Sequence, residues 1–141
     1  MFFSLTKIRV RYADTDQMKM VYYGKYFEYF EQGRSDLMRE IGMPYSEIEK
    51  RGIFIPVIEA HAEYGKPCRF DELLEVKTIL KEIPSSKIII EYELRNAETS
   101  ELYATGYTHH CFLNSSNQIP TRAPVYFREA VEKAFLTTSI K

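Results

Sequence analysis

The spacing of hydrophobic residues predicts one long helix in the first third of the chain. Between residues 24 and 41, apolar or small residues recur every three or four positions, which places them along one face of an α-helix of about five turns. This face consists of Tyr26, Phe30, Gly33, Leu37 and Ile41. Gly33 has no side chain, so we expect another part of the backbone to approach the helix there. Gly42 is suited to the left-handed conformation that ends a helix.

Most of the remaining pattern predicts strands and two shorter helices. From Ser4 to Ala13, apolar residues alternate with Lys7, Arg9 and Arg11, as they do along a half-buried strand. We interpret this basic row as a solvated face that discourages pairing at a sheet edge, the alternative being a track for phosphate groups. Turn-forming residues separate the later elements, which are a helix at 44–50, strands at 53–64, 73–83, 87–96 and 102–113, and a helix at 125–135.

The order of these elements predicts an α+β fold with two layers. Short turns join the last four strands, so we expect an antiparallel meander among them, within a five-stranded sheet that wraps around the long helix. Pro56 lacks a backbone N–H, which favours an edge position or an irregular start for its strand. One helix cannot cover both faces of five strands, so a homodimer is predicted. Residues 1–141 are expected to form a single domain.

Composition narrows the functional classes. The 19 Lys and Arg residues against 20 Asp and Glu leave a formal net charge of −1, which provides no basic excess for nucleic acid. The two cysteines are too few for a disulfide framework or a four-cysteine zinc site. No apolar run is long enough to span a membrane and no signal peptide is recognisable, so a cytoplasmic protein is expected. The 11 Tyr and 9 Phe residues favour a core or pocket built from aromatic rings.

Common catalytic signatures are missing from the chain. There is neither a glycine-rich phosphate-binding loop nor a Gly-x-Ser-x-Gly motif, so a serine triad is not expected. His109 and His110 are adjacent on a predicted strand and point to opposite faces, so they cannot ligate one metal together. We therefore predict no metal site.

Two carboxylates, Asp14 and Asp16, stand between the first strand and the long helix. One interpretation is that both are helix caps or turn formers. The other is catalytic: residues 17–21 are long enough to turn back before the helix begins near Tyr23 and Gly24, which would place a carboxylate beside the free N–H groups of the helix N-terminus. Such N–H groups stabilise an oxyanion, and a carboxylate facing an oxyanion hole is typical of an acyl-transfer site.

The segment from Tyr12 to Arg34 carries a more specific signal. It reads YADTDQMKMVYYGKYFEYFEQGR and resembles the signature of the 4-hydroxybenzoyl-CoA thioesterase family, in particular the YbgC-like acyl-CoA thioesterases. The resemblance extends over about residues 5–135 and includes Gly42-Met43-Pro44 and residues 56–64. It implies the hotdog fold, in which an antiparallel sheet wraps a long helix and two copies pair as a dimer.

The resemblance also implies an activity and its residues. The activity is hydrolysis of an acyl-CoA thioester to the free acid and coenzyme A. The family's catalytic carboxylate falls on Asp16, as general base or as nucleophile, and its backbone donor to the thioester carbonyl falls on the N–H of Tyr23. Val21, Tyr22 and Gly24 flank that donor and are implied to contact the substrate.

This sequence departs from the family pattern at two places. Tyr23 stands where many YbgC-like sequences have His, which removes any role of a His side chain but leaves the backbone donor. Residues 17–20 are bulkier than the glycine-rich stretch usual there, which bears on the choice of acyl chain.

The resemblance indicates partners and leaves alternatives. Coenzyme A carries phosphates, so Lys66 and Arg69 are candidate contacts, solvated turn charges being the alternative. Coenzyme A or an acyl-carrier protein enters as part of the substrate, so no cofactor is expected, and the homodimer is open to pairing as a dimer of dimers. A hotdog dehydratase would need a His near an Asp on the helix, and residues 24–41 contain none. The remaining alternative is a non-catalytic module that binds acyl-CoA or acyl-carrier protein.

Overall fold

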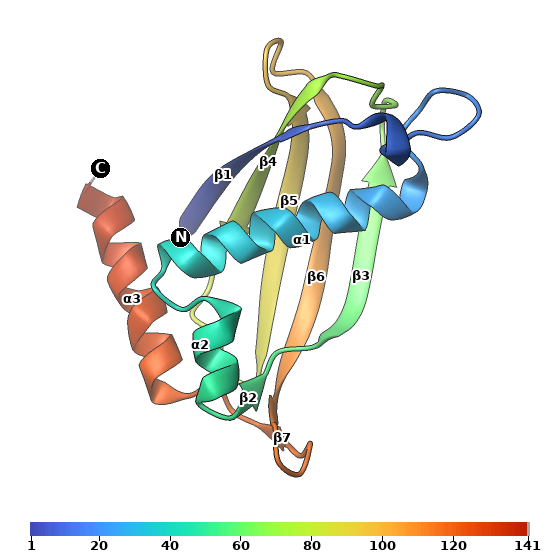
Figure 1. The fold of residues 1–141 in the computed structure, drawn as a ribbon. Coiled ribbons are helices and arrows are strands. Elements are labelled where there is room, and N and C mark those ends of the chain that lie inside the picture. The colour runs from blue at the N-terminus through green and yellow to red at the C-terminus, as the bar shows by residue number, and fades with distance from the viewer. Residues whose placement is uncertain (141) are drawn as a thin grey trace.

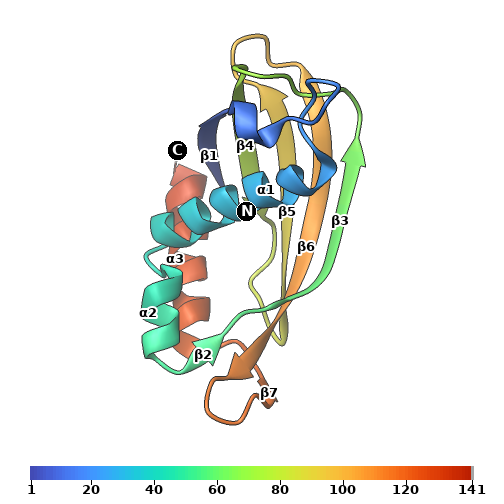
Figure 2. The same ribbon diagram turned by 45° about the vertical axis from the view of Figure 1, so that its right-hand side comes forward.

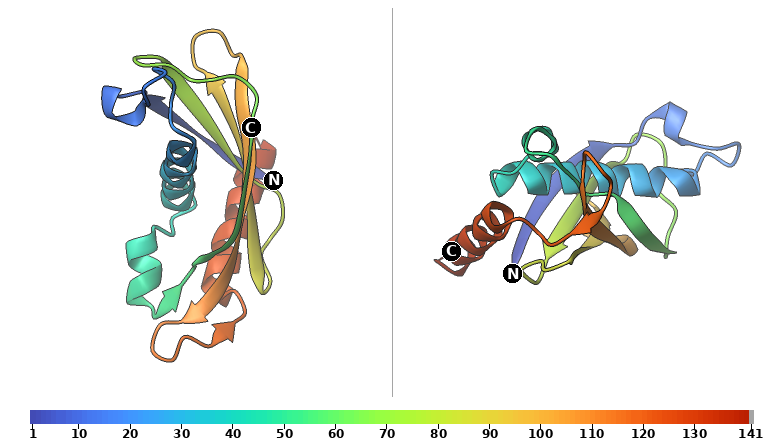
Figure 3. Two further views of the ribbon diagram at one scale, coloured as in Figure 1. Left: turned by 90° about the vertical axis from the view of Figure 1, so that its right-hand side faces the viewer. Right: turned by 90° about the horizontal axis from the view of Figure 1, so that it is seen from below.

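A curved antiparallel sheet wraps around one long helix in the computed structural model, which describes residues 1–140 (Figure 1). The main strands are β1 (Phe2–Arg9), β3 (Val57–Tyr64), β4 (Leu73–Leu80), β5 (Lys87–Asn96) and β6 (Leu102–Asn114). The long helix, α1 (Tyr23–Glu40), crosses the concave face of this sheet (Figure 3). The shorter elements are the 3-10 helix η1 (Tyr12–Asp14), α2 (Tyr45–Lys50), β2 (Ile53–Phe54), β7 (Pro120–Thr121) and the terminal α3 (Val125–Ile140). The predicted α+β class is confirmed.

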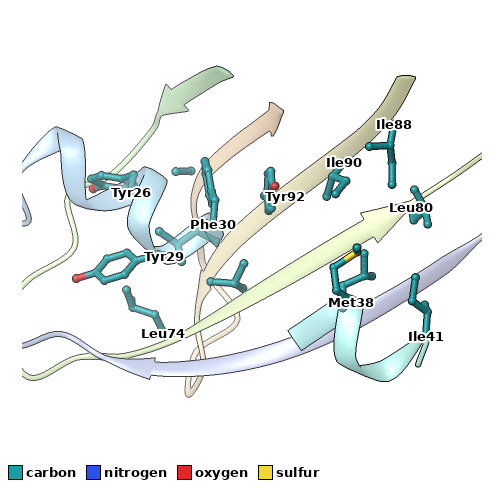
Figure 4. Close-up of a cluster of buried hydrophobic side chains, with 14 of the residues drawn as sticks. Tyr26, Tyr29, Phe30, Met38, Ile41, Leu74, Leu80, Ile88, Ile90 and Tyr92 are labelled. Carbon is teal, nitrogen blue, oxygen red and sulfur yellow. The ribbon is translucent and has the colours of Figure 1, made fainter. Parts of the chain in front are cut away.

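One buried face holds α1 against the sheet. The buried residues of the helix are Tyr26, Tyr29, Phe30, Gly33, Leu37 and Met38. The ring of Phe30 stacks on that of Tyr92 from β5, with centroids 4.5 Å apart and planes 10° from parallel (Figure 4). Burial of one such side chain contributes about 1.5–3 kcal/mol, so packing of this face, more than helix propensity, stabilises α1. The helix ends at Glu40, and Gly42, two positions later, has the predicted left-handed conformation with a φ of +82°.

Two glycines allow the helix and the sheet to approach closely. A Cβ on Gly33 would lie 2.8 Å from Cγ1 of Val76 and would also overlap Oγ1 of Thr78, both on β4. The sheet therefore approaches closely at Gly33, but the expected backbone neighbour is wrong, because the neighbours are the side chains of Val76 and Thr78. On β6, a Cβ on Gly106 would lie 2.6 Å from the ring of Phe30.

The predicted meander is correct for β4, β5 and β6 and wrong for β3. The first three are consecutive antiparallel neighbours, but β3 pairs with the far side of β6. The free edge of β4 is occupied by β1, from Phe2 opposite Leu80 to Arg9 opposite Leu73. Residues 65–72 therefore cross from one end of the sheet to the other, and strands come to lie on both sides of α1 (Figure 2). A short connection between two strands does not make them neighbours in the sheet. Here β3 and β4 lie apart because the sheet wraps around α1.

The bounds of several elements also differ from the prediction. The first strand ends at Arg9, because residues 12–14 form η1. The strand predicted at 53–64 is interrupted at Ile55 and Pro56, which separates β2 from β3, and β3 is an edge strand as Pro56 indicated. Strand β4 is shorter than predicted and α3 is longer, whereas β5 matches its predicted range.

Candidate active site

A loop of the chain projects beyond the N-terminus of α1 (Figures 1 and 2). After η1, the chain folds back on itself between Thr15 and Val21, which face each other in an isolated antiparallel bridge. The N–H of Asp16 donates to the carbonyl of Met20 at 2.8 Å, and Lys19 has a left-handed φ of 64°. Residues 17–21 thus turn back before the helix begins, as the sequence predicts. We call residues 15–21 the Asp16 loop.

A second segment, residues 65–72, supports the Asp16 loop. Met20 pairs with Arg69 in another isolated bridge, and the N–H of Val21 donates to the carbonyl of Cys68 at 2.9 Å. The carboxylate of Glu72 accepts the N–H of Arg69 at 2.6 Å and the hydroxyl of Tyr103 at 2.5 Å. Glu72 therefore connects the 65–72 segment, which supports the Asp16 loop, to β6. Sequence reasoning missed this residue because its partner Tyr103 lies on β6, 31 positions away along the chain.

Asp14 is buried, with 3% of its surface exposed. Its carboxylate accepts the hydroxyl of Tyr29 at 2.9 Å, the N–H of Arg11 at 3.1 Å and the guanidinium of Arg11 at 3.1 Å. Burial alone would raise the pKa of Asp14, but the hydrogen bonds from Arg11 and Tyr29 outweigh it and hold the pKa below its usual value. The backbone carbonyl of Asp14 also accepts the N–H of Tyr22 at 3.0 Å. Asp14 thus ties the loop to the helix.

Asp16 lies in different surroundings, because its side chain is exposed. Its Oδ1 accepts the N–H of Met18 at 2.8 Å and that of Met20 at 3.3 Å. Both bonds are within the Asp16 loop, and no bond joins this carboxylate to Tyr23 among residues 1–140. The other oxygen, Oδ2, has no protein donor in this part of the chain. The carboxylate is held in one orientation and is accessible to solvent.

The first turn of α1 has free donors. Tyr22 precedes it as the N-cap residue and provides no side-chain cap. The N–H of Lys25 donates to the carbonyl of Tyr22 at 2.9 Å. The N–H groups of Tyr23 and Gly24 have no acceptor within the described residues. The positive end of the helix dipole adds to their attraction for an anion.

Aromatic rings lie near the N–H groups of Tyr23 and Gly24. The ring of Tyr64, at the end of β3, lies 5.0 Å from that of Tyr23 and 4.8 Å from that of Tyr26. Its hydroxyl donates to the carbonyl of Tyr23 at 3.4 Å. Tyr22 and Tyr23 are exposed. Tyr64 was not among the predicted site residues, and no local pattern marks it, because it is brought there by the pairing of β3 with β6.

The remaining residues predicted to contact substrate are Val21, Lys66 and Arg69, and they differ in how accessible they are. Val21 is buried, so only its backbone is available to a substrate. Arg69 pairs with Met20 and so lies beside the Asp16 loop, whereas the ammonium of Lys66 forms an ion pair with Glu101 at 2.8 Å. Arg69 is therefore beside the loop, and the charge of Lys66 is compensated by Glu101.

Other reactive groups near the site are inert or absent. Burial raises the pKa of the Cys68 thiol to about 11, so it is protonated at neutral pH and not a nucleophile. Within residues 1–140, no group of three or more His, Cys, Asp or Glu side chains is arranged to hold a metal ion. In the same range, no helix is long and apolar enough to cross a membrane.

Comparison with known proteins identifies the family of the chain. Residues 10–135 match the model of the thioesterase-like superfamily. The chain belongs to this family. YneP of Bacillus subtilis is 32% identical over 130 residues, which are 92% of this chain and 91% of YneP. The DHNA-CoA thioesterase of Staphylococcus aureus is 34% identical with a TM-score of 0.88, and the match covers 100% of this chain and 97% of that one.

The resemblance stated from the sequence is confirmed by these relatives. The acyl-CoA thioester hydrolase YbgC of Escherichia coli is 26% identical over 95 residues, which are 67% of this chain and 71% of YbgC. The predicted hotdog fold is confirmed by the family and by the structure, and the prediction of a thioester-hydrolysing enzyme is confirmed at the level of the family.

Proposed function

We propose that the protein hydrolyses acyl-CoA thioesters, with Asp16 as the catalytic carboxylate and the Tyr23 N–H as the donor to the thioester carbonyl. The observation that carries the proposal is the pair of unbonded N–H groups at the start of α1, next to a loop that holds an exposed carboxylate. Donors fixed in advance stabilise the oxyanion that forms during acyl transfer, and loss of one such donor typically costs about 3–4 kcal/mol.

The reaction has two routes that start from the same carboxylate. In the first, Asp16 takes a proton from water, and the water oxygen attacks the thioester carbon. In the second, Asp16 attacks that carbon itself to form an anhydride, which water then hydrolyses. In both routes the C–S bond breaks, the thiolate of coenzyme A leaves and takes up a proton, and the acid is released. The free Oδ2 of Asp16 is the atom that acts in either route.

Substrate contacts follow from the surroundings of α1. The exposed Tyr22, the Gly24 N–H and the backbone of Val21 are proposed to contact the thioester region, and Lys66 and Arg69 the phosphates of coenzyme A. Arg69 is the better placed of the two cations, since Lys66 is paired with Glu101. The rings of Tyr23 and Tyr64, tilted by 45° to each other, offer an apolar surface, and the Staphylococcus aureus relative is named for DHNA-CoA. An aromatic acyl group therefore belongs among the substrates tested.

The proposed enzyme is a homodimer. Seven of the eight residues of β3 are exposed, and β3 is paired on one side only, to β6. Val57 and Ile58 on this strand are 46% and 49% exposed. An exposed apolar edge strand is a template for pairing with a second chain. Tyr64 ends this strand at the candidate site, so a partner paired along β3 would lie beside the site and each active site would draw on both chains.

The activity is tested by a panel of aliphatic and aromatic acyl-CoA thioesters, with free thiol as the product measured. We expect at least one substrate to be hydrolysed with a kcat/KM well above the background rate. The same acyl groups on acyl-carrier protein distinguish the two carriers. Binding of acyl-CoA without release of thiol from any substrate would identify a non-catalytic module, in which Asp16 only closes its loop.

A further inference from the structure

A buried tyrosine of α1 bonds to the segment that precedes the Asp16 loop. Tyr29 is 2% exposed, and its ring belongs to the cluster of buried side chains between α1 and the sheet (Figure 4). Its hydroxyl donates to Oδ2 of Asp14 at 2.9 Å. Burial and the hydrogen bond to the charged Asp14 raise the pKa of Tyr29, so its hydroxyl keeps its proton and donates at neutral pH. The reaction proposed above does not use this hydroxyl.

The bond from Tyr29 is the one that joins Asp14 to the long helix. The two other bonds to this carboxylate come from Arg11, the residue that precedes η1, so they close the turn around η1. The side chain of Arg11 is 71% exposed, where solvent weakens an ion pair. The bond from Tyr29 is buried and spans 15 positions of the chain. It therefore fixes η1 relative to α1.

Asp14 in turn holds the backbone at the start of α1. Its carbonyl accepts the N–H of Tyr22 at 3.0 Å, and the carbonyl of Cys68 accepts the N–H of Val21 at 2.9 Å. The two residues before Tyr23 are thus fixed by their N–H groups, and the N–H of Tyr23 is the next along the chain. A displacement of Asp14 would move Tyr22 and, with it, the proposed donor.

Asp14 is also close in the chain to the proposed catalytic carboxylate. Asp16 follows it by two positions, and Thr15 between them faces Val21 in the bridge that closes the Asp16 loop. The contact of Tyr29 with Asp14 therefore acts on the position of the Asp16 carboxylate as well as on that of the Tyr23 N–H. A misplacement of reacting groups by about 1 Å can cost on the order of a hundredfold in rate.

We propose that Tyr29 is a positioning residue for thioester hydrolysis, which acts through Asp14 to keep the Tyr23 N–H and the Asp16 carboxylate in place. The inference rests on the proposed function and adds to it a residue that has no part in the chemistry itself. Tyr29 lies within the motif of residues 12–34, but nothing in the sequence distinguishes it from the other aromatic residues of α1.

Tyr29→Phe tests the proposal, because it removes the hydroxyl and keeps the buried ring. Tyr92→Phe is the matched control: Tyr92 is 1% exposed, and its hydroxyl is bonded to Arg34 and Thr108. Both variants lose the bonds of a buried hydroxyl, so both should be less stable in urea denaturation. We expect kcat to fall about tenfold or more in Tyr29→Phe, with KM within about twofold, and both constants to stay within about twofold in Tyr92→Phe. Unchanged kcat in Tyr29→Phe, or an equal loss in the control, would overturn the proposal.

A double-mutant cycle tests whether Tyr29 acts through Asp14. Asp14→Ala removes the acceptor of the Tyr29 hydroxyl but keeps the backbone carbonyl that holds Tyr22. If Tyr29 acts through this carboxylate, adding Tyr29→Phe to Asp14→Ala should lower kcat no further, because the bond is already lost. Losses that multiply would mean that the two residues act separately, which contradicts the proposal.

Hydrogen exchange measured by NMR reports the same link without any substrate and needs only the Phe variants. In Tyr29→Phe, the N–H of Tyr22 should exchange with solvent about tenfold faster or more, since its bond to Asp14 becomes less persistent, whereas Tyr92→Phe should leave that rate within about twofold. If exchange rises in this way but no thioester is hydrolysed, the proposed function fails and the link from Tyr29 to the start of α1 stands. If thioesters are hydrolysed and neither kcat nor exchange changes in Tyr29→Phe, the proposed function stands and the positioning role fails.

Discussion

Asp14 and Asp16 are two positions apart, yet their carboxylates are in opposite surroundings. Asp14 is buried and accepts bonds from Arg11 and Tyr29, which leaves it no access to a substrate. Asp16 is exposed and keeps one oxygen free of protein donors in the described part of the chain. Because of this contrast we propose that Asp14 braces the loop and that Asp16 carries the chemistry.

Asp16→Asn tests the chemical role. The amide preserves the size of the side chain and its Oδ1 can still accept the N–H groups of Met18 and Met20, but it can act neither as base nor as nucleophile. General-base contributions are typically about 10²–10⁴-fold, so kcat on the best thioester should fall at least about a hundredfold with little change in substrate binding. Steady-state kinetics measure both. Full activity in this variant would mean that the carboxylate only closes its loop.

Asp14→Asn is the matched control for that experiment. Here a buried acceptor of three bonds becomes a neutral amide, so the loss should appear as about 1–3 kcal/mol in the free energy of unfolding, measured by urea denaturation. The effect on kcat should be the smaller one. Equal losses of kcat in the two variants would show that the aspartates act as a unit.

Tyr23→Phe separates the backbone of this residue from its side chain. The proposed donor is the N–H, which the substitution leaves unchanged, and the Tyr64 hydroxyl bonds to the Tyr23 carbonyl and not to its ring. We expect kcat/KM to stay within a few fold of the unaltered protein. A hundredfold loss with the fold intact, checked by circular dichroism, would instead assign a role to the hydroxyl.

Some residues of the candidate site were predictable from the sequence and others were not, for a physical reason. Asp16 and Tyr23 belong to one continuous motif, and the turn between them is local, so their proximity to the helix start is predictable. Tyr64 is 41 positions from Tyr23, and Glu72 is 31 from Tyr103, so their contacts depend on strand pairing that no local pattern specifies.

The same limit applies to whole elements. Strand β5 was predicted with its bounds, because apolar and charged residues alternate from Ile90 to Arg95 and its turns are clear. The neighbour of β3 was predicted wrongly. An alternating pattern states which residues face the helix, but β3 has exposed residues on both faces and so carries no such information. Its position follows from its pairing with β6.

Gly33→Ala tests how closely α1 packs on β4. In an exposed helix alanine would be favoured over glycine by about 1 kcal/mol, but here its Cβ would overlap Val76 and Thr78. We expect a net destabilisation of about 1–3 kcal/mol in urea denaturation. Gln32→Ala, on the exposed side of the same helix, should leave stability unchanged or slightly raised. A stabilised Gly33→Ala variant would mean that the contact with β4 is loose.

A polar network connects α1 with α2 and the sheet beneath it. Arg34 donates to the hydroxyls of Tyr45 and Tyr92 at 3.0 Å each, and the Tyr92 hydroxyl lies 2.6 Å from Oγ1 of Thr108. Nε2 of His110 lies 2.9 Å from the same Oγ1. Burial, reinforced by the charge of Arg34, lowers the pKa of His110 from 6.5 to about 4.

This lowered pKa predicts a loss of stability in mild acid. Between pH 6.5 and 4 the unfolded chain binds a proton at His110 that the folded chain does not, so the free energy of unfolding should fall as the pH drops through this window. We expect a loss on the order of 1–2 kcal/mol between pH 7 and 5, measured by urea denaturation. His110→Gln should flatten this dependence, whereas His61→Gln, at an exposed position, should not. Asp14, whose pKa is lowered, contributes only at more acidic pH.

At the scale of the whole molecule, one helix covers one face of the sheet and leaves the edge at β3 open. This edge carries the exposed Val57 and Ile58 and ends at Tyr64, beside the free donors of α1. Assembly and activity are therefore expected to depend on the same strand.

Ile58→Asp tests this dependence. It places a charge on the open edge of β3, where two copies are proposed to pair, so the protein should become monomeric in light scattering and lose most of its thioesterase activity. Ile89→Asp is the matched control: it has a similar exposure, 47% against 49%, but lies on β5, an interior strand. It should leave the dimer and its activity intact, and would at most separate a dimer of dimers. A stable monomer of the unaltered protein with full activity would show that the site needs one chain only.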